Sequence, residues 1–146
     1  MRLKYYDMRR AMLKVKDTLR STVNLTFDGR VIKTYHGKDA LRRFSNEVFI
    51  LRHLEAAGCP FVPRLLEWDE KMLRIVTTNC GSRVEHLDPD RQQEVFDQLE
   101  RFGVRHEDQD LRNITYRPSD GQFCVIDFEF ASLLPPNNKA DSQPAP

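Results

Sequence analysis

The sequence has no long hydrophobic run and no apolar leader. None of its 146 residues belongs to a stretch that approaches the roughly 18 apolar residues of a membrane span. The first ten residues, MRLKYYDMRR, lack the apolar core of a secretory signal. We therefore expect no secretion, no membrane insertion and no membrane partner.

Cysteine and net charge are also scarce. The three cysteines, Cys59, Cys80 and Cys124, are too few and too scattered for a disulfide framework or a zinc motif, and they fit a reducing, cytoplasmic location. The 23 Lys and Arg residues nearly balance the 22 Asp and Glu residues, for a formal net charge of +1. This balance argues against a nucleic-acid partner that is bound through a bulk basic field.

What the chain does have is the composition of one soluble globular domain. Hydrophobic residues make up 40% and charged residues 31% of the sequence, and a chain of this length can bury a substantial core. We expect a single domain over residues 1–134. The tail over residues 135–146, PPNNKADSQPAP, is expected to be disordered.

The first half of the sequence predicts a small antiparallel sheet with one helix. Alternating apolar residues predict strands near 12–19, 23–27 and 30–35, with Asp28-Gly29 as a type I′ hairpin turn. The period then becomes helical over 38–57, where Phe44, Glu47, Leu51 and Leu54 share one face and Arg42, Arg43 and Arg52 lie mostly elsewhere. Residues 64–68 and 72–78 predict a second hairpin.

The second half predicts a helix, a polar loop and a hairpin. Asp88 is a good N-cap for a helix that ends before Gly103. The loop over 106–113 precedes strands at 114–117 and 122–126, and Asp127-Phe128-Glu129 follows directly. The fold class is therefore expected to be α+β.

One candidate pair lies in the first half. Glu47 is a carboxylate in the middle of an apolar helix stripe, and a buried charge requires a partner. Lys33, in a predicted strand, is the natural candidate. The alternative is that Glu47 tilts into solvent beside Arg43.

The second half supplies oxygen ligands. Asn113 and Asp127 offer two oxygen donors that suit Mg²⁺, which prefers one or two protein ligands plus phosphate oxygens. Asp108 would then orient a hydroxyl nucleophile. The alternative is that this is an ordinary acidic loop and that Asp127 caps a turn.

These residues together resemble the protein-kinase-like superfamily, which includes protein kinases and small-molecule kinases. Residues 106–113 match H-x-D-x-x-x-x-N, and residues 127–129 stand where the family has D-F-G or D-F-E. Residues 31–33 look like the strand with the nucleotide-binding lysine, and residues 46–51 look like the helix with its glutamate. Residues 75–81 look like the adenine-holding strand and hinge, so the resemblance spans residues 12–131 in the family order.

The resemblance implies a kinase-like fold and a set of roles. The N-lobe would cover about residues 1–79, and a heavily truncated C-lobe of helix, catalytic loop and β-hairpin about residues 80–134. Lys33 would contact the ATP phosphates and pair with Glu47, and Asp108 would be the catalytic base. Asn113 and Asp127 would hold Mg²⁺.

The remaining implied roles concern adenine, packing and charge. The backbone of Thr78 and Cys80 would bind adenine, with Thr77 at the back of the pocket. His106 would pack near Phe128. Arg112 would supply positive charge near the transferring phosphoryl group, although an exposed arginine is the simpler interpretation.

The sequence departs from the family in two regions. It has no G-x-G-x-x-G, so hydroxyls and backbone amides of residues 18–22, including Ser21 and Thr22, would have to cradle phosphate. Glu107 and Asp110 replace basic residues of protein kinases. Few residues follow Phe130, so we expect either a minimal kinase or a chain whose reduced C-lobe is completed by a partner protein or a second copy of the chain.

Three functions remain open at this stage. The leading one is a minimal ATP- and Mg²⁺-dependent phosphotransferase that acts on a hydroxyl of a small molecule or a protein. The second is a pseudokinase, a nucleotide-binding or regulatory module without catalysis. The third is an α+β interaction domain without nucleotide.

Overall fold

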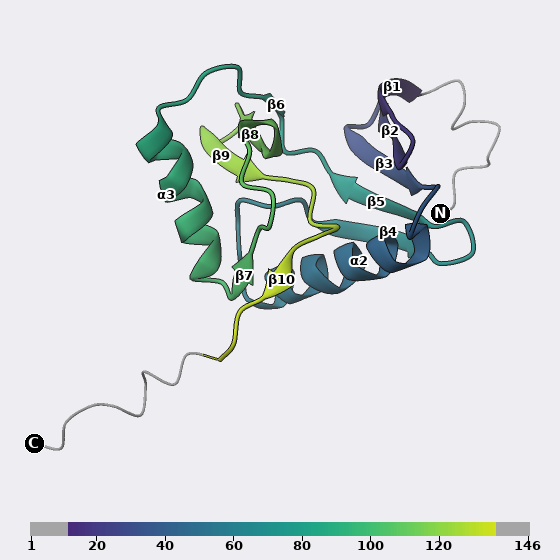
Figure 1. The fold of residues 1–146 in the computed structure, drawn as a ribbon. Coiled ribbons are helices and arrows are strands. Elements are labelled where there is room, and N and C mark those ends of the chain that lie inside the picture. The colour runs from purple at the N-terminus through teal and green to yellow at the C-terminus, as the bar shows by residue number, and fades with distance from the viewer. Residues whose placement is uncertain (1–11, 137–146) are drawn as a thin grey trace, which may run out of the picture.

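The computed structural model describes residues 12–136 and has an α+β fold (Figure 1). The tail expected over residues 135–146 lies, from residue 137 onward, outside the described residues. Within residues 12–136, no helix has the length and apolarity that crossing a membrane requires.

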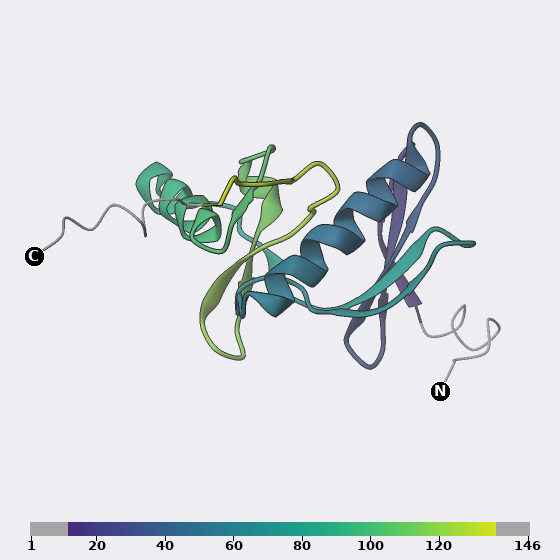
Figure 2. The ribbon, with the colours of Figure 1, turned by 90° about the horizontal axis from the view of Figure 1, so that it is seen from below.

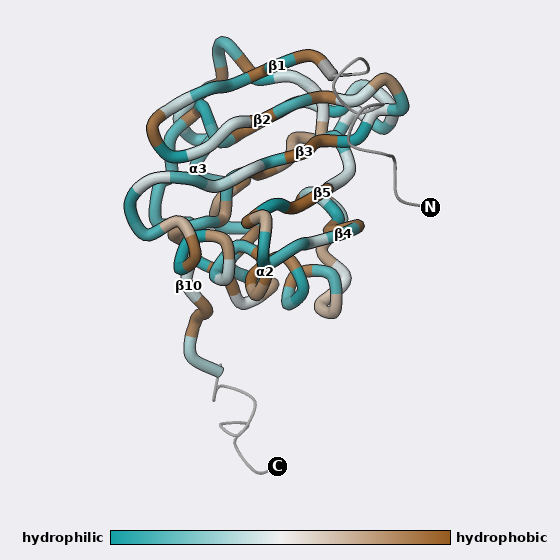
Figure 3. The backbone as a smooth tube through the Cα atoms, turned by 90° about the vertical axis from the view of Figure 1, so that its right-hand side faces the viewer, coloured by the Kyte–Doolittle hydropathy of each residue, from teal (hydrophilic) through white to brown (hydrophobic). Residues whose placement is uncertain are grey.

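A five-stranded antiparallel sheet forms the first half. It consists of β1 (Met12–Asp17), β2 (Ser21–Thr26), β3 (Arg30–Tyr35), β4 (Leu65–Asp69) and β5 (Arg74–Thr78), in the order β1-β2-β3-β5-β4. Figure 3 looks onto this sheet and shows the strands in that sequence. The predicted strands are confirmed, with ends shifted by a few residues. The central position of β3 gives Lys33 strand neighbours on both sides, at Val23 and Ile75.

The turn between β2 and β3 corrects one expectation. A type I′ turn needs a positive φ at both central residues, but of Asp28 and Gly29 only Gly29 has one, at 80°. The Gly29 N–H donates to the Thr26 carbonyl at 3.1 Å, and the loop between the strands has three residues, 27–29. Such three-residue loops place a left-handed glycine after a tight turn and keep the strands paired.

The helix α2 (Ala40–Ala56) crosses one face of the sheet (Figure 2). The predicted apolar face is confirmed, because Phe44, Leu51 and Leu54 are buried together with Glu47. The expectation that Arg43 lies mostly away from this face is wrong. Arg43 is 3% exposed, and it precedes Glu47 by four residues, the spacing that places two side chains on one helical face.

The second half contains α3 (Pro89–Glu100) and short β-pairings. Asp88 caps α3 by accepting from the backbone of Asp90 and Arg91, as predicted. The hairpin of β8 (Ile114–Arg117) and β9 (Gln122–Val125) is confirmed, and β6 (Ser82–Arg83) joins it as a third strand. A further pair, β7 (Val104–Arg105) with β10 (Ser132–Leu133), was not predicted from the sequence. The one-turn helix η1 (Leu111–Asn113) precedes β8.

The two halves share one hydrophobic core. Buried side chains of α2, including Leu51 and Leu54, belong to the same cluster as Phe96 and Leu99 of α3 and Phe128 near the C-terminal end of the described chain. In Figures 1 and 2 the segment after β9 runs beside α2. This segment brings Asp127 back to the sheet, which positions the site described next.

Candidate functional site

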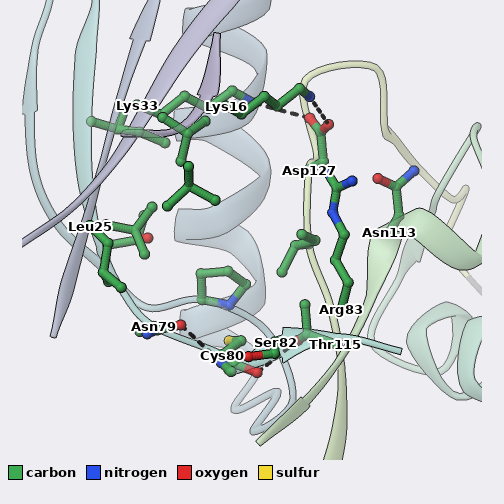
Figure 4. Close-up of a pocket in the computed structure, with 18 of the residues that line it drawn as sticks. Lys16, Leu25, Lys33, Asn79, Cys80, Ser82, Arg83, Asn113, Thr115 and Asp127 are labelled. Carbon is green, nitrogen blue, oxygen red and sulfur yellow. Dashed lines mark hydrogen bonds and ion pairs between the residues drawn. The ribbon is translucent and has the colours of Figure 1, made fainter. Parts of the chain in front are cut away.

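A cavity of about 490 Å³, called the main cavity below, lies between the sheet and the second half of the chain (Figure 4). Its walls are largely apolar, and its polar residues gather at two ends. Figure 4 shows Asn79 and Cys80 at one end and Lys16, Lys33 and Asp127 at the other. The apolar side chains that line it are Val15, Val23, Leu25, Val31, Leu51, Pro63, Ile75 and Ile126. Small-molecule sites are mostly apolar cavities of this size with a few convergent polar groups.

Lys33 lies at the polar end among three carboxylates. Its Nζ is 2.8 Å from Glu47 Oε1, 3.0 Å from Asp127 Oδ1 and 3.8 Å from Glu129 Oε2. The predicted Lys33–Glu47 pair is confirmed, and the alternative of a solvent-exposed Glu47 is wrong because Glu47 is 3% exposed. Burial alone would lower the pKa of Lys33, but the three carboxylates outweigh it and raise the pKa above its usual value. Lys33 is therefore positively charged.

Glu47 connects the sheet to the C-terminal segment. Its Oε1 also accepts from the Tyr35 hydroxyl, and its Oε2 accepts from the Phe128 backbone N–H at 2.6 Å. Burial, and then the charge of Glu47, raise the pKa of Tyr35 well above its usual value, so the hydroxyl keeps its proton and donates it. Both carboxylate oxygens are satisfied, which is the condition for keeping a charge in the interior.

Asp127 is held in an unusual backbone conformation. Its φ is 69°, in the left-handed region that residues other than glycine rarely adopt. The flanking Ile126 N–H donates to the Asn113 carbonyl at 2.9 Å and fixes the segment beside η1. Burial alone would raise the pKa of Asp127, but Lys33 and Lys16 hold it below its usual value. Lys16 approaches Asp127 Oδ2 only to 3.9 Å, so this oxygen is loosely held. Strained residues of this kind cluster at functional sites.

The polar loop places Asp108 beside Asn113. Asn113 Nδ2 donates to the Asp108 carbonyl at 2.9 Å and to Asp108 Oδ2 at 3.1 Å. His106 supports this loop, because its Nε2 lies 2.9 Å from the Ile126 carbonyl and its Nδ1 accepts from the Asp108 N–H at 3.2 Å. The His106 and Phe128 rings are 5.4 Å apart, so the predicted packing is confirmed.

Arg112 lies over the loop and not in the main cavity. Its guanidinium forms an ion pair with Asp108 and lies 3.4 Å from Asp110 Oδ2. A second cavity, of about 400 Å³, is lined by Arg112, Asp108, Asp127 and Lys16 among others. Because Asp127 and Lys16 line both cavities, the two spaces meet at these side chains.

The linker after β5 forms the other end of the main cavity. Thr77, Asn79, Cys80 and Gly81 line it, whereas Thr78 does not. The Thr78 N–H donates to the Arg64 carbonyl at 3.0 Å. The Cys80 carbonyl accepts from Thr115 Oγ1 at 2.7 Å, and among residues 12–136 the Cys80 N–H has no hydrogen-bond acceptor.

Gly81 brings the linker against β8. Its φ is 91°, and a Cβ at this position would lie 1.9 Å from the Tyr116 carbonyl oxygen. Only glycine fits such an approach. The linker is thereby fixed against the second half.

The turn between β1 and β2 uses its own backbone donors. The Thr18 N–H donates to the Ser21 carbonyl at 2.9 Å, and Thr18 Oγ1 accepts from the N–H groups of Arg20 and Ser21, each at 3.2 Å. Thr22 Oγ1 contacts Asp17 and His36 instead of either cavity, while Ser21 lines the second cavity. Three amides expected to cradle phosphate are therefore already occupied, and Thr22 lines neither of the two cavities.

The donor set fits Mg²⁺ only together with phosphate. Within residues 12–136, no group of three or more His, Cys, Asp or Glu side chains could hold a metal ion by itself. Asn113 and Asp127 both line the main cavity. Because Asn113 donates through Nδ2, its amide oxygen remains an acceptor. Mg²⁺ usually takes one or two protein oxygens and completes its shell with water and phosphate.

Three charged residues of the site were not assigned there from the sequence. Lys16 approaches Asp127. Arg43 NH1 lies 3.2 Å from Glu129 Oε2, and Glu129 in turn approaches Lys33. The four-residue spacing of Arg43 and Glu47 was a usable signal. For Lys16 and Glu129 the partners are remote in sequence, and no local pattern indicates them.

The sequence was also compared with known proteins. No family model matches it, and no curated protein matches it.

Proposed function

We propose that this protein is a minimal kinase with a protein-kinase-like fold, which moves the γ-phosphate of ATP to a hydroxyl acceptor with the help of Mg²⁺. The observation that supports this most directly is the convergence of Lys33, Glu47 and Asp127 at the end of the main cavity, where the loop with Asp108 and Asn113 meets it. The strand order and the packing of α2 also agree with the N-lobe that the resemblance implies.

The main cavity suits a nucleotide with adenine at the linker. The apolar walls would enclose the base, and the available Cys80 N–H would donate to it. Of the expected pair of backbone contacts, the one at Thr78 would have to come from its carbonyl, because the Thr78 N–H already donates to the Arg64 carbonyl. At the other end, Lys33 is fixed by Glu47 and would bind the phosphates.

Mg²⁺ would bind through Asp127 and the amide oxygen of Asn113. The metal would neutralise charge on the phosphate oxygens and orient them. Before nucleotide binds, Lys33 and Lys16 balance the charge of Asp127.

In this proposal Asp108 accepts the proton of the hydroxyl. As the hydroxyl oxygen bonds to the γ-phosphorus, the bond from phosphorus to the bridging oxygen of ADP breaks, and the Asp108 carboxylate takes the proton. Asn113 holds the carboxylate in place at 3.1 Å. The acceptor would enter through the second cavity, which Asp108 lines.

Two observations favour a pseudokinase as the second candidate. Arg112 pairs with the Asp108 carboxylate, the group that must receive the proton. The turn between β1 and β2 also lacks free amides at Thr18, Arg20 and Ser21 for phosphate. In that case the cavity would bind nucleotide without transfer.

The test is phosphate transfer from γ-labelled ATP, with wild type and Asp108→Asn compared side by side. Asp108→Asn keeps the side-chain volume and can still accept from Asn113, so folding and ATP affinity should be retained. Transfer or ATP hydrolysis should fall by about 10²-fold or more. The matched control is Asp97→Asn, which replaces an exposed aspartate on α3.

Equal rates in wild type and Asp108→Asn would exclude Asp108 as the base. ATP binding without any turnover across a broad acceptor panel would favour the pseudokinase.

A further inference from the structure

A polyphosphate needs more positive charge or more donors than Lys33 alone supplies. Kinases with a glycine-rich loop use its backbone N–H groups for this purpose. Here, the N–H groups of Thr18, Arg20 and Ser21 donate within their own turn. The phosphates must therefore be held mainly by side chains.

Three cationic side chains line the main cavity, Lys16, Lys33 and Arg83. Two of them already have carboxylate partners, since Lys33 bonds to Glu47 and Asp127 and Lys16 approaches Asp127. Arg83 is different. Among the described residues it forms no ion pair with any carboxylate, and its side chain donates no hydrogen bond.

Figure 4 shows how these cations lie. Lys16 reaches toward Asp127 from the sheet, and Arg83 extends toward it from β6 in the second half. The backbone at Arg83 is fixed by pairing with Thr115 of β8. The side chain is therefore held at its Cα by the β-pairing, and its guanidinium extends toward the end of the cavity that Asp127 lines.

We propose that Arg83 binds the phosphate chain of the nucleotide and, with Lys16 opposite, replaces the missing glycine-rich loop. This inference rests on the proposed function and adds a phosphate-binding residue to it. A guanidinium binds phosphate oxygens in a bidentate way, which a lysine does not reproduce. When phosphate is bound, Lys16 turns from Asp127 to the nucleotide, and Asp127 is released for Mg²⁺.

The experiment compares the affinities of ATP and adenosine in the presence of Mg²⁺. Calorimetry would be run on wild type, Arg83→Gln, Lys16→Gln and the control Arg101→Gln, which replaces an exposed arginine at the end of α3. Because a hydrogen bond between charged groups contributes about 1.5–3 kcal/mol, Arg83→Gln should weaken ATP binding by about tenfold or more. Adenosine binding should not change. Arg83→Lys should recover only part of the loss.

The outcomes separate this inference from the proposed function. Equal loss of ATP and adenosine affinity in Arg83→Gln, or no loss of either, would overturn the role of Arg83 and leave the kinase proposal intact. If wild type binds no ATP, both proposals fail. Because the Arg83 side chain forms no ion pair and donates no hydrogen bond among the described residues, the melting curve of Arg83→Gln should match that of wild type, which checks that the variant folds.

Discussion

At the scale of single residues, the site is a cluster of balanced charges. Three cations, Lys16, Lys33 and Arg43, lie against three carboxylates, Glu47, Asp127 and Glu129, in a largely buried space. A buried charge is tolerated when its partners and hydrogen bonds are complete. Asp127 is the least enclosed of the carboxylates, with a side chain 24% exposed, and is therefore the one that a ligand can reach.

The depressed pKa of Asp127 predicts a specific pH dependence. A carboxylate whose pKa is lower in the folded state adds stability above its unfolded pKa and loses it as the pH falls through the folded value. We expect the free energy of unfolding of wild type to exceed that of Asp127→Asn at about pH 7. The difference should shrink as the pH falls below the usual value of 3.8 toward the lower folded pKa.

Urea unfolding from about pH 7 down to about pH 2 measures this difference. Asparagine tolerates the positive φ of this position as well as aspartate does, so the substitution tests charge and not backbone strain. A difference that stays constant over the whole range would contradict the interpretation.

At the scale of elements, α2 joins the sheet to the C-terminal segment. Glu47 accepts from the Phe128 N–H, and Asn46 Nδ2 donates to the carbonyls of Glu129 and Ala131 at 3.0 and 2.9 Å. Arg43 adds an ion pair with Glu129. One face of one helix thus determines where Asp127 lies relative to Lys33.

Arg43 and Arg42 offer a matched comparison on this helix. Arg43 donates to the carbonyls of His36 and Lys38 in addition to its ion pair with Glu129, whereas Arg42 is exposed. Arg43→Gln leaves a buried carboxylate without its main partner and should lower the free energy of unfolding by about 3–5 kcal/mol. Arg42→Gln should change it by less than about 0.5 kcal/mol. Urea unfolding measures both, and equal effects would show that Arg43 does not stabilise the segment through its charge.

The elements were predictable from the sequence where the signal is local. The apolar stripe around Phe44 and Leu51 predicts α2, and the cap at Asp88 predicts the start of α3. The Lys33–Glu47 pair was one of two alternatives from the sequence, because a carboxylate in an apolar stripe requires a cation unless it tilts into solvent. Contacts such as Arg43–Glu129 depend on residues 86 positions apart. No period or turn motif reports such a pairing, so only the structure shows it.

The type of the β2–β3 turn shows a different limit of prediction from the sequence. Asp28-Gly29 correctly marks a hairpin, but the same residues fit both a two-residue turn and a three-residue loop with glycine in the left-handed region. Pairing of Leu25 with Val31 selects the three-residue loop. The register of the strands, a long-range property, decides between two locally allowed turns.

At the scale of the whole molecule, the proposed nucleotide site is built from both halves. The sheet and α2 supply Lys33 and Glu47, and the second half supplies Asn113 and Asp127. Besides the linker, the halves are connected by the shared core and by the contacts of α2. A ligand in the cavity would contact both halves at once, and it would bind the native state but not the unfolded chain.

This arrangement predicts that ATP with Mg²⁺ raises the melting temperature. A ligand at a hundredfold excess over its Kd stabilises the native state by roughly 2.7 kcal/mol, which for a domain of this size is on the order of 10 °C. Mg²⁺ alone should give no shift, because Asn113 and Asp127 need phosphate to complete the metal shell. Thermal unfolding with and without each ligand measures the shifts.

Lys33→Met tests whether the shift comes from this site. The variant itself should melt at a lower temperature, since Glu47 loses its main partner, so the relevant quantity is the shift that ATP adds and not the melting temperature alone. That shift should nearly vanish in Lys33→Met and persist in Lys38→Met, where the lysine side chain is exposed and forms no ion pair among the described residues. An equal shift in both variants would place the nucleotide elsewhere. If millimolar ATP does not shift the melting temperature of wild type, the remaining interpretation is an α+β interaction domain that binds no nucleotide.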